Sequence, residues 1–438
     1  MRAIRLSLWL IIGLPVLLWL PFEQIQGQGF FALRGSVVQL TGLLALSCMA
    51  AALLLAIRPR WLERPLSGLD RMYRLHKWLG IAALVLSVLH WLAAKGPKWA
   101  VGWGWLEPPK RHGQTQLEGL HGWLNSQRGL AESLGEWAFY ALLLLVALAL
   151  WKRFPYRHFF RLHRLLGLVW LVLVWHSLVL AKFSYWSTPV GLLLAGLLLT
   201  GSLAALVSLS GRIGLGRRAV ARIENLEYHP DNRVLGVALQ LLSDWHGHRA
   251  GQFAFVTFDP AEGPHPFSIA SAWQGDGQLR FLIKGLGDYT NTLPDSLRNG
   301  DLAVVEGPYG CFDFNDDCPT QVWVAGGIGI VPFIARLRAL AAQPDGRQVT
   351  LFYCTNMPDQ GFINRLQQQA TEAGVQLQVL DTRLQTKLDL PTIRQQVPGS
   401  QAASLWFCGP SGFGQLLRRQ LRDEGSRGRF HAELFEMR

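Results

Sequence analysis

The sequence predicts an α-helical membrane bundle of six transmembrane helices, followed by an antiparallel β-barrel domain and an α/β domain with a parallel sheet. Three observations predict these parts. The first half of the 438 residues contains six apolar stretches long enough to cross a bilayer. Short alternating strands begin after residue 217, and after residue 320 a strand runs through a glycine-rich turn into a helix. We therefore expect three domains, over residues 1–210, 215–316 and 317–438.

The composition supports a membrane protein with a water-soluble part. Half of the residues are hydrophobic and only 16% are charged. The formal net charge is +12, but the basic residues are concentrated in short loops between apolar stretches, a pattern that membrane orientation explains. We therefore expect no nucleic-acid partner. The five cysteines form no CxxC motif, which gives no sign of a zinc or iron–sulfur site.

The six expected spans cover residues 5–22, 36–57, 72–95, 134–152, 161–182 and 187–209. The first span has an alternative interpretation as a signal peptide, because Arg2 and Arg5 precede its apolar run. Pro21, Phe22 and Glu23 follow that run where a cleavable signal would have small residues. We therefore expect an uncleaved helix.

The distribution of arginine and lysine predicts the orientation. The loops after the second and fourth spans and the segment after the sixth are basic, and basic loops face the cytoplasm. We expect an integral protein of the bacterial inner membrane with its N-terminus and C-terminal domains in the cytoplasm. The segment 96–133 then lies outside. It contains His112 and His121, which we interpret as ordinary loop histidines rather than a metal-chelate site.

Two spans each contain two histidines. His76 and His90 are fourteen residues apart in the third span, and His163 and His176 are thirteen apart in the fifth, so each pair is separated by ~20 Å along its helix. An ionisable residue inside a span indicates function by default. Because both helices run in the same direction, His76 is level with His163, and His90 with His176. Each level offers two imidazoles, which suits six-coordinate haem iron. The alternative is a set of interhelical hydrogen bonds.

The thirteen-residue spacing rotates His176 ~140° away from His163 on an ideal helix, so the fifth helix is expected to bend or to meet its two haems from different sides. Trp170 lies midway between these histidines and is interpreted as a packing residue rather than a bridge between haems. Cations suited to haem propionates lie beside the inner level, namely Arg71, Arg74, Arg161 and Arg164.

Two segments of the expected barrel carry candidate flavin chemistry: His265-Pro266-Phe267-Ser268 and Gly287-Asp288-Tyr289-Thr290. The first can stack an aromatic ring on an isoalloxazine and present the Ser268 hydroxyl to it. The second can fold backbone amides around a pyrophosphate. Either segment alone is common turn chemistry.

The α/β domain carries a candidate dinucleotide site. The strand 321–325 runs into Gly326-Gly327-Ile328-Gly329, and Pro332 stands in the first turn of the following helix, an arrangement suited to a dinucleotide phosphate. Further strands over 348–354, 376–380 and 404–408 predict a Rossmann-like parallel sheet. The last of these ends at Cys408-Gly409-Pro410, at the carboxyl edge where ligands bind.

Taken in order, these features resemble the ferric reductase and NADPH oxidase family, from about residue 35 to the end of the chain. The resemblance implies a six-helix bis-histidine haem domain fused to a ferredoxin-reductase-like module that binds FAD and NAD(P)H. The implied cofactors are FAD and two b-type haems, with NADPH or NADH as the electron donor. The implied iron ligands are His76, His90, His163 and His176.

The resemblance also implies roles for residues of the soluble part. His265, Pro266, Phe267 and Ser268 look like the flavin-contacting segment, and Gly287, Asp288, Tyr289 and Thr290 like the flavin-phosphate loop. The nicotinamide-nucleotide segments are similar to Gly307-Pro308-Tyr309-Gly310, to Gly326, Gly327, Gly329 and Pro332, and to Cys408-Gly409-Pro410. Phe435 is similar to the aromatic residue that covers the flavin. The candidate catalytic residues are Ser268, Cys408 and Phe435.

The expected function is electron transfer from cytoplasmic NAD(P)H to an acceptor outside the membrane, first of all as a ferric-chelate reductase. The alternative acceptors are oxygen, a quinone or a periplasmic protein, and a non-redox membrane protein is the alternative class. Ala94 stands where animal oxidases of the family have a further histidine, which argues against oxygen. Asn356 stands where an arginine for the NADPH 2′-phosphate is often found, so both nucleotides stay open, with a lean to NADPH. Arg34 is a candidate contact for the acceptor or a propionate.

Overall fold

The structure of the protein, a computed structural model, describes residues 2–23, 29–107, 118–151, 153–384, 388–425 and 429–433. It divides into two compact units: a helical unit of residues 1–66 and 71–213, and a soluble unit of residues 67–70 and 214–437. The three-domain division expected from the sequence stays a prediction.

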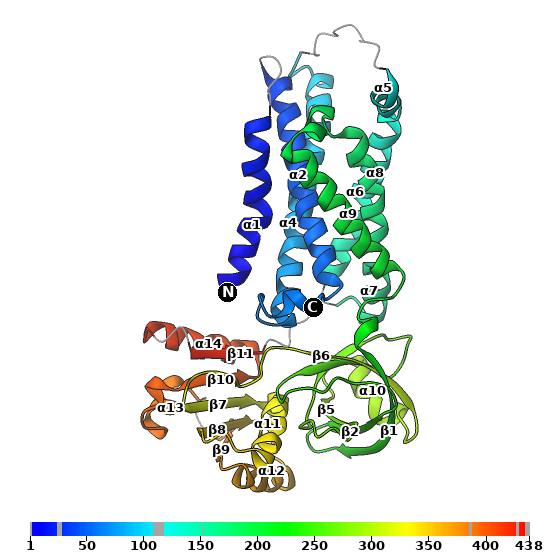
Figure 1. Ribbon diagram of the computed structural model, residues 1–438. Helices are drawn as coiled ribbons and strands as arrows, with labels where there is room; N and C mark the ends of the chain where they lie inside the picture. Colours follow the sequence, from blue (N-terminus) through cyan, green and yellow to red (C-terminus); the bar gives the residue numbers. More distant parts are fainter. Residues whose placement is uncertain are drawn as a thin grey trace. The chain divides into compact units, whose positions relative to one another are not determined.

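The helical unit consists of long apolar helices joined by short segments (Figure 1). The helices are α1 (Arg2–Trp19), α2 (Phe30–Ala56), α3 (Arg60–Glu63), α4 (Leu69–Gly102), α5 (Gly119–Ser126), α6 (Arg128–Leu150), α7 (Tyr156–His163), α8 (Leu166–Leu180) and α9 (Pro189–Leu209). Within the described residues six segments are long and apolar enough to cross a membrane, over Ile4–Phe22, Phe30–Ala56, Leu69–Gly102, Arg128–Leu150, Tyr156–Leu180 and Pro189–Leu209. The six expected spans are therefore confirmed.

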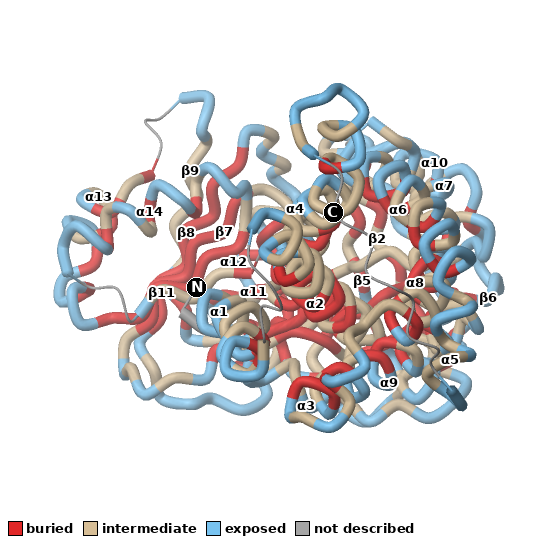
Figure 2. Tube along the Cα trace, turned by 90° about the horizontal axis from the view of Figure 1, so that it is seen from above, coloured by how far each residue is buried: buried red, intermediate tan, exposed pale blue. Residues whose placement is uncertain are grey.

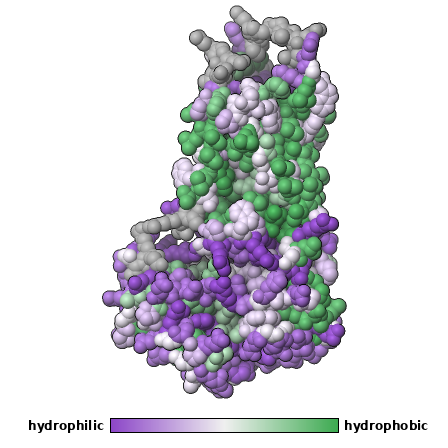
Figure 3. All heavy atoms as spheres, in the orientation of Figure 1, coloured by the Kyte–Doolittle hydropathy of each residue, from purple (hydrophilic) through white to green (hydrophobic). Residues whose placement is uncertain are grey.

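The outer surface of the helical unit is apolar. Leucines such as Leu144, Leu192 and Leu199 are more than half exposed, and Figure 3 shows hydrophobic side chains along the helices. The interior is formed where α2 packs on α1 and α9, and where α6 packs on α8. An apolar surface of this kind is unfavourable in water and stable in contact with lipid. The protein is an integral membrane protein.

The first half of the soluble unit is a six-stranded antiparallel sheet with the order β4-β3-β6-β1-β2-β5. Its strands are β1 (Arg218–His229), β2 (Val234–Leu241), β3 (Phe253–Thr257), β4 (His265–Ser268), β5 (Gln278–Lys284) and β6 (Leu302–Tyr309), and α10 (Asp288–Ser296) follows β5. An antiparallel bridge between Ile269 and Phe281 connects the two edge strands, which closes the sheet into the expected barrel. Alternate residues such as Val237 and Val305 fill the interior.

The second half is a parallel sheet with the order β11-β10-β7-β8-β9. Its strands are β7 (Thr320–Gly326), β8 (Gln348–Thr355), β9 (Gln376–Asp381), β10 (Ser404–Cys408) and β11 (Phe430–Ala432). One face is covered by α11 (Val331–Ala342) and α12 (Gln360–Glu372), the other by α13 (Leu390–Gln396) and α14 (Ser411–Asp423). Because both faces are covered, β7 and β8 are buried along their length (Figure 2). The expected fold class is confirmed in all three parts.

Candidate functional site

The four histidines of the spans lie in two pairs whose rings meet edge-on. The imidazole centroids of His76 and His163 are 5.8 Å apart, and those of His90 and His176 are 6.2 Å apart. A metal ion held by ~2 Å bonds to two imidazoles would separate the centroids by about 6 Å. The His76 pair (His76 and His163) and the His90 pair (His90 and His176) therefore each fit one iron atom. The structure brings together the same partners that the sequence placed at the same level.

Three of the four rings are anchored to a main-chain carbonyl of another helix. The Nδ1 atom lies 2.9 Å from the Ala52 oxygen for His76, 3.0 Å from the Val38 oxygen for His90, and 2.8 Å from the Ala131 oxygen for His176. When Nδ1 donates its hydrogen to such a carbonyl, Nε2 is left as the unprotonated nitrogen that binds a metal. The anchors thus select the tautomer and the ring orientation that a haem ligand needs.

His163 is the exception. Its buried Nδ1 has no hydrogen-bond partner in the described part of the chain, and its ring packs on Phe159 with 4.9 Å between centroids. Among the described residues, packing is what holds this ring.

Two glycines make room for the rings of the His90 pair. A Cβ atom at Gly135 of α6 would lie 2.0 Å from Nδ1 of His176, and one at Gly42 of α2 would lie 3.2 Å from Cε1 of His90. Sequence reasoning missed both glycines, because a glycine in an apolar span gives no signal until the neighbouring helix is placed.

The fifth span is broken between its two histidines. Helix α7 ends at His163 and α8 begins at Leu166, and amides of this region bond three residues back, as Leu165 does to Leu162 and Leu168 to Leu165. This tighter winding adds rotation to each residue. The break lies between the two histidines, where the thirteen-residue spacing predicts either a bend or haems met from different sides.

Two of the expected cation contacts are engaged within the protein. Arg164 donates to the main-chain oxygens of Ser208 at 3.0 Å and Leu209 at 2.8 Å, at the end of α9. Arg34 donates to the oxygen of Ala93 at 2.9 Å. That oxygen has no helical donor because Pro97 lacks the N–H four residues on. Both arginines therefore donate to main-chain oxygens that lack a donor within their own helix. A contact of either arginine with a propionate or an acceptor stays a prediction.

Trp170 is 1% exposed and lies against Gly201, where an added Cβ would be 2.3 Å from the indole. Its Nε1 donates to the Ser202 hydroxyl at 3.3 Å. These contacts agree with a packing role. His121 stacks on Phe183 with 4.3 Å between centroids, whereas His112 lies outside the described residues. Within the described ranges, no three side chains of histidine, cysteine or acid are grouped to hold a metal ion.

The two predicted flavin segments meet in the structure. His265 of β4 stacks on Tyr289 of α10 with 4.4 Å between centroids and an angle of 25°. Burial lowers the pKa of His265 to about 4, so this ring is neutral at neutral pH. Ser268 ends β4 with a buried hydroxyl that has no partner among the described residues. A buried hydroxyl without a partner is costly, and a ligand ring with a polar edge would satisfy it.

The first turn of α10 offers amides to an anion. The Thr290 hydroxyl accepts hydrogen bonds from the amides of Leu286 at 3.0 Å and Gly287 at 3.1 Å. These two amides are therefore occupied, and the role of Gly287–Thr290 as the flavin-phosphate loop stays a prediction. The amides of Asp288, Tyr289 and Thr290 form the first turn of α10, where a helix has no internal acceptors and attracts negative charge.

The predicted nucleotide loops lie side by side at the carboxyl edge of the parallel sheet. Strand β7 pairs with β10, which brings Gly326 next to Gly409. A Cβ at Gly329 would lie 2.2 Å from the Cys408 oxygen, so only glycine permits this approach. Pro332 stands in the first turn of α11. The structure thus places the N-terminus of a helix beside a glycine-lined edge, the arrangement that binds a dinucleotide phosphate.

Gly307 and Pro308 lie near the end of β6, in the barrel rather than in the α/β half. Strand β6 is followed by Gly310, where an added Cβ would lie 3.4 Å from Oε1 of Glu433, directly after β11. The end of the barrel strand therefore lies next to the carboxyl edge of the parallel sheet.

Two buried acidic groups meet at this edge. Cys408 is fully buried, and burial followed by the nearby Glu433 raises the pKa of its thiol well above the usual range. Glu433 is 5% exposed, and burial raises the pKa of its carboxyl well above the usual range. Sequence reasoning missed Glu433; an acidic residue directly after a short strand at the ligand edge was the available signal. Phe435 lies outside the described residues.

The fold and these sites define a membrane protein with a fused flavin- and nucleotide-binding unit. Residues 41–174 match the family model of the ferric reductase like transmembrane component, and residues 219–312 match a family model of a FAD-binding domain. The chain thus carries a ferric reductase-like transmembrane domain fused to a FAD-binding module of the ferredoxin-reductase type.

Curated relatives match mainly one part of the chain. It is 31% identical over 195 residues to a flavohemoprotein of Bordetella pertussis, covering 39% of this chain and 48% of the relative. It is 28% identical over 177 residues to an NADPH oxidoreductase of Mycobacterium tuberculosis, covering 39% and 47%. The chain spans about half the length of these relatives.

Similar solved structures include the flavohemoglobin of Malassezia yamatoensis with bound FAD and heme. It shows 18% identity and a TM-score of 0.47, covering 92% of this chain and 98% of that one. The FAD/NAD-binding domain of a nitric oxide dioxygenase from Vibrio cholerae shows 22% identity and a TM-score of 0.42, covering 49% and 97%.

Proposed function

We propose that this protein is a transmembrane oxidoreductase that carries electrons from NAD(P)H, through FAD and two b-type haems, to an acceptor across the membrane. The observation that carries the proposal is the pair of imidazole sites inside the spans, with centroids 5.8 and 6.2 Å apart. When bound, FAD accepts two electrons from the nicotinamide and releases them singly, and each haem carries one at a time. The matched family domains support this combination.

The helical unit supplies fixed ligands. The carbonyls of Val38 and Ala131 hold the rings of His90 and His176, and the carbonyl of Ala52 holds His76. Two imidazoles at each site would occupy both ligand positions of a haem iron, which would suit electron transfer rather than substrate binding at the metal. Because the protein already holds these rings in place, little rearrangement is needed when the charge of the site changes.

The soluble unit supplies buried polar groups for the flavin and the nicotinamide. Ser268 offers a hydroxyl to the flavin, and the first turn of α10 offers amides to its phosphates. Cys408 and Glu433 are candidates for the nicotinamide side of the site. Burial raises the pKa of both groups, so Cys408 holds its proton on Sγ at neutral pH, and the carboxyl of Glu433 is shifted towards its protonated form.

We place the N-terminus and the soluble unit in the cytoplasm of a bacterial cell, with the His76 pair as the inner site. The basic loops over residues 58–77 and 152–164 support this orientation. A ferric chelate is the preferred outer acceptor, since Ala94 leaves the position of a further histidine without an imidazole. Oxygen, a quinone and a periplasmic protein are the other acceptors.

An acceptor assay on the purified full chain tests this proposal. We expect absorbance bands of flavin and of b-type haem, and NADPH consumption with ferric chelate under argon. Absence of both cofactors would refute the redox function. Turnover with oxygen alone, accompanied by superoxide, would replace the reductase with an oxidase. Comparison of kcat/KM for NADPH and NADH decides the donor, which Asn356 leaves open.

A further inference from the structure

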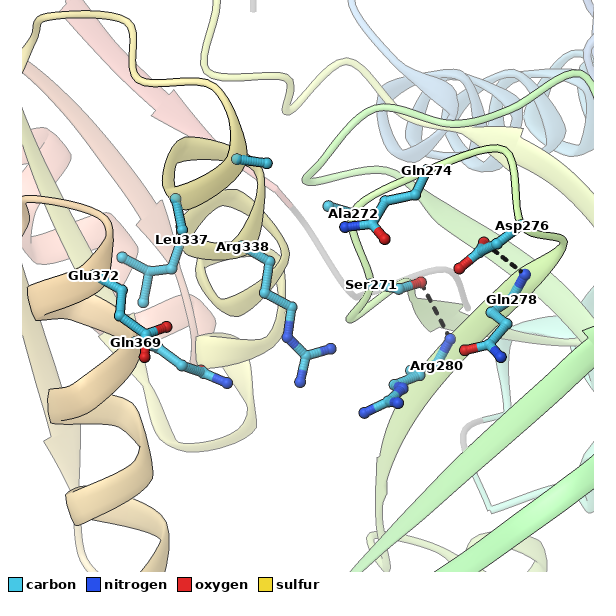
Figure 4. A pocket seen from close by; sticks show the side chains of 12 residues that line it. Ser271, Ala272, Gln274, Asp276, Gln278, Arg280, Leu337, Arg338, Gln369 and Glu372 are labelled. Atoms are coloured by element: carbon cyan, nitrogen blue, oxygen red, sulfur yellow. Dashed lines mark hydrogen bonds between the residues drawn. The ribbon is translucent and has the colours of Figure 1, made fainter.

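A cavity of about 480 Å³ lies within the soluble unit and shares no lining residue with the predicted flavin or nucleotide segments. One wall is the outward face of β5 with the turn before it, and the other is the last turns of α11 and α12 (Figure 4). Both helices begin at the carboxyl edge of the parallel sheet and end at its opposite edge. The cavity is therefore distinct from the nucleotide edge at Gly326–Gly329.

Two guanidinium groups point into this cavity from opposite walls, Arg280 from β5 and Arg338 from α11 (Figure 4). Nη1 of Arg338 donates to the Ala270 oxygen at 3.0 Å, which fixes the group while its other N–H donors remain available. Burial and the positive charge of Arg280 lower the pKa of Arg338. The two like charges are therefore close enough to repel each other.

Within the described residues, no carboxylate forms an ion pair with either of these arginines. In the described part of the chain, neither Arg280 nor Arg338 has a carboxylate oxygen within 4.0 Å, whereas Arg336 on the same helix pairs with Asp345 at 2.5 Å. Asp276 and Glu372 do line the cavity. The Asp276 carboxylate accepts the Gln278 amide at 3.0 Å, and the Glu372 carboxylate accepts from Gln368 at 2.9 Å.

We propose that this cavity binds a phosphate-type dianion between Arg280 and Arg338, either inorganic phosphate or a phosphate monoester. A guanidinium presents paired N–H donors that match phosphate oxygens. When one dianion lies between the two guanidinium groups, each group is attracted to it, and this attraction offsets the repulsion between the two positive charges. The side-chain amides of Gln278 and Gln369 line the same cavity and offer further donors. Because the arginines come from the barrel and from the α/β half, the bound dianion links the two.

Titration calorimetry on the full chain tests this site. FAD and NADP⁺ are kept saturating so that the cofactor sites are filled, and sodium chloride holds the ionic strength constant. Inorganic phosphate is expected to bind one per chain with a Kd on the order of 1 mM, as two charge-assisted contacts at an open site allow. Ribose 5-phosphate is the second probe. Tighter binding of the ester identifies an ester site, and equal or weaker binding identifies inorganic phosphate.

Variants separate a built site from general ion binding. Arg280→Gln and Arg338→Gln should each weaken binding by about tenfold or more, while Arg365→Gln on the outer part of α12 removes the same charge and should leave it unchanged. Glu372→Gln should tighten binding about two- to threefold, because it removes from the cavity wall a negative charge that repels the dianion. Arg280 is exposed, so its variant is expected to fold normally. Absence of binding of both probes, or binding that survives both arginine variants, would overturn the proposal.

Discussion

The two histidine pairs have similar distances between their rings, 5.8 and 6.2 Å, but hold those rings differently. In the His90 pair both Nδ1 atoms lie on main-chain carbonyls, and Gly42 and Gly135 provide the space for the rings. In the His76 pair only His76 has such an anchor, while His163 rests on Phe159. Hydrogen bonds to main-chain carbonyls therefore hold both rings of the His90 pair. In the His76 pair a hydrogen bond holds one ring and packing holds the other.

This difference teaches that equal ligand sets need not bind equally. A hydrogen bond to the second ring nitrogen orients a metal-bound imidazole and raises its basicity, and losing it typically weakens metal binding roughly 10- to 100-fold. We therefore expect the His90 pair to hold its haem more tightly than the His76 pair.

The largest expected effect is the loss of one whole haem. His76→Ala and His90→Ala should each remove about half of the haem, because each leaves one imidazole for its iron atom. Flavin content and flavin reduction by NADPH should be unchanged in both variants, since the soluble unit is untouched. Pyridine haemochrome absorbance per chain provides the measurement. Full haem content in either variant would refute the assignment of these histidines as iron ligands.

Gly135→Ala should approach the effect of His90→Ala. The new methyl group would lie 2.0 Å from Nδ1 of His176 and would displace the ring from its Ala131 anchor. Gly129 lies on the same helix with nothing within 4 Å of an added Cβ, so Gly129→Ala is the matched control. Haem content is measured for both. Equal haem content in the two variants would show that the Gly135 contact does not shape the site.

A smaller effect should separate the two sites kinetically. Haem transfer to apomyoglobin is measured from His90→Ala, which keeps only the His76 pair, and from His76→Ala, which keeps only the His90 pair. The first should lose its haem roughly 10- to 100-fold faster, because the His163 ring has no carbonyl anchor among the described residues. Equal rates, or the reverse order, would contradict the comparison.

Gly42→Ala should have the smallest effect. Its methyl group would lie 3.2 Å from Cε1 of His90, a contact that a shift of a few tenths of an ångström relieves. We expect both haems to remain, with haem transfer from the His90 pair about two- to fivefold faster. Gly35→Ala, on the same helix with open space around it, is the control. Complete loss of a haem would mean that the ring cannot move.

The spans, the strands and the histidine partners could be predicted from the sequence because lipid and buried sheets impose simple periodic patterns. The spacing of His163 and His176 predicted a bend or haems met from different sides, and the helix is interrupted between the two residues, where α7 ends and α8 begins. The rise per residue of a helix fixes how deep each histidine lies in the membrane. Histidines at the same depth could therefore be matched as partners without knowing how the helices pack.

Contacts that depend on the approach of two backbones could not be predicted. The anchoring oxygen of Ala131 and the space at Gly135 exist only once α6 packs on α8. Glu433 is buried only because β11 joins the edge of the sheet. Arg164 was expected near a propionate, and its bonds to the end of α9 follow from a helix that sequence alone does not place.

Electron transfer across the membrane is tested most directly in sealed vesicles that contain the full chain and trapped ferricyanide. NADPH added outside reaches only molecules whose soluble unit faces outward. We expect the trapped ferricyanide to be reduced by wild-type protein and by Gly129→Ala, and not by His76→Ala or His90→Ala. Trapped ferricyanide that stays oxidised in wild-type vesicles, while external ferricyanide is reduced at the full rate, would contradict transmembrane transfer.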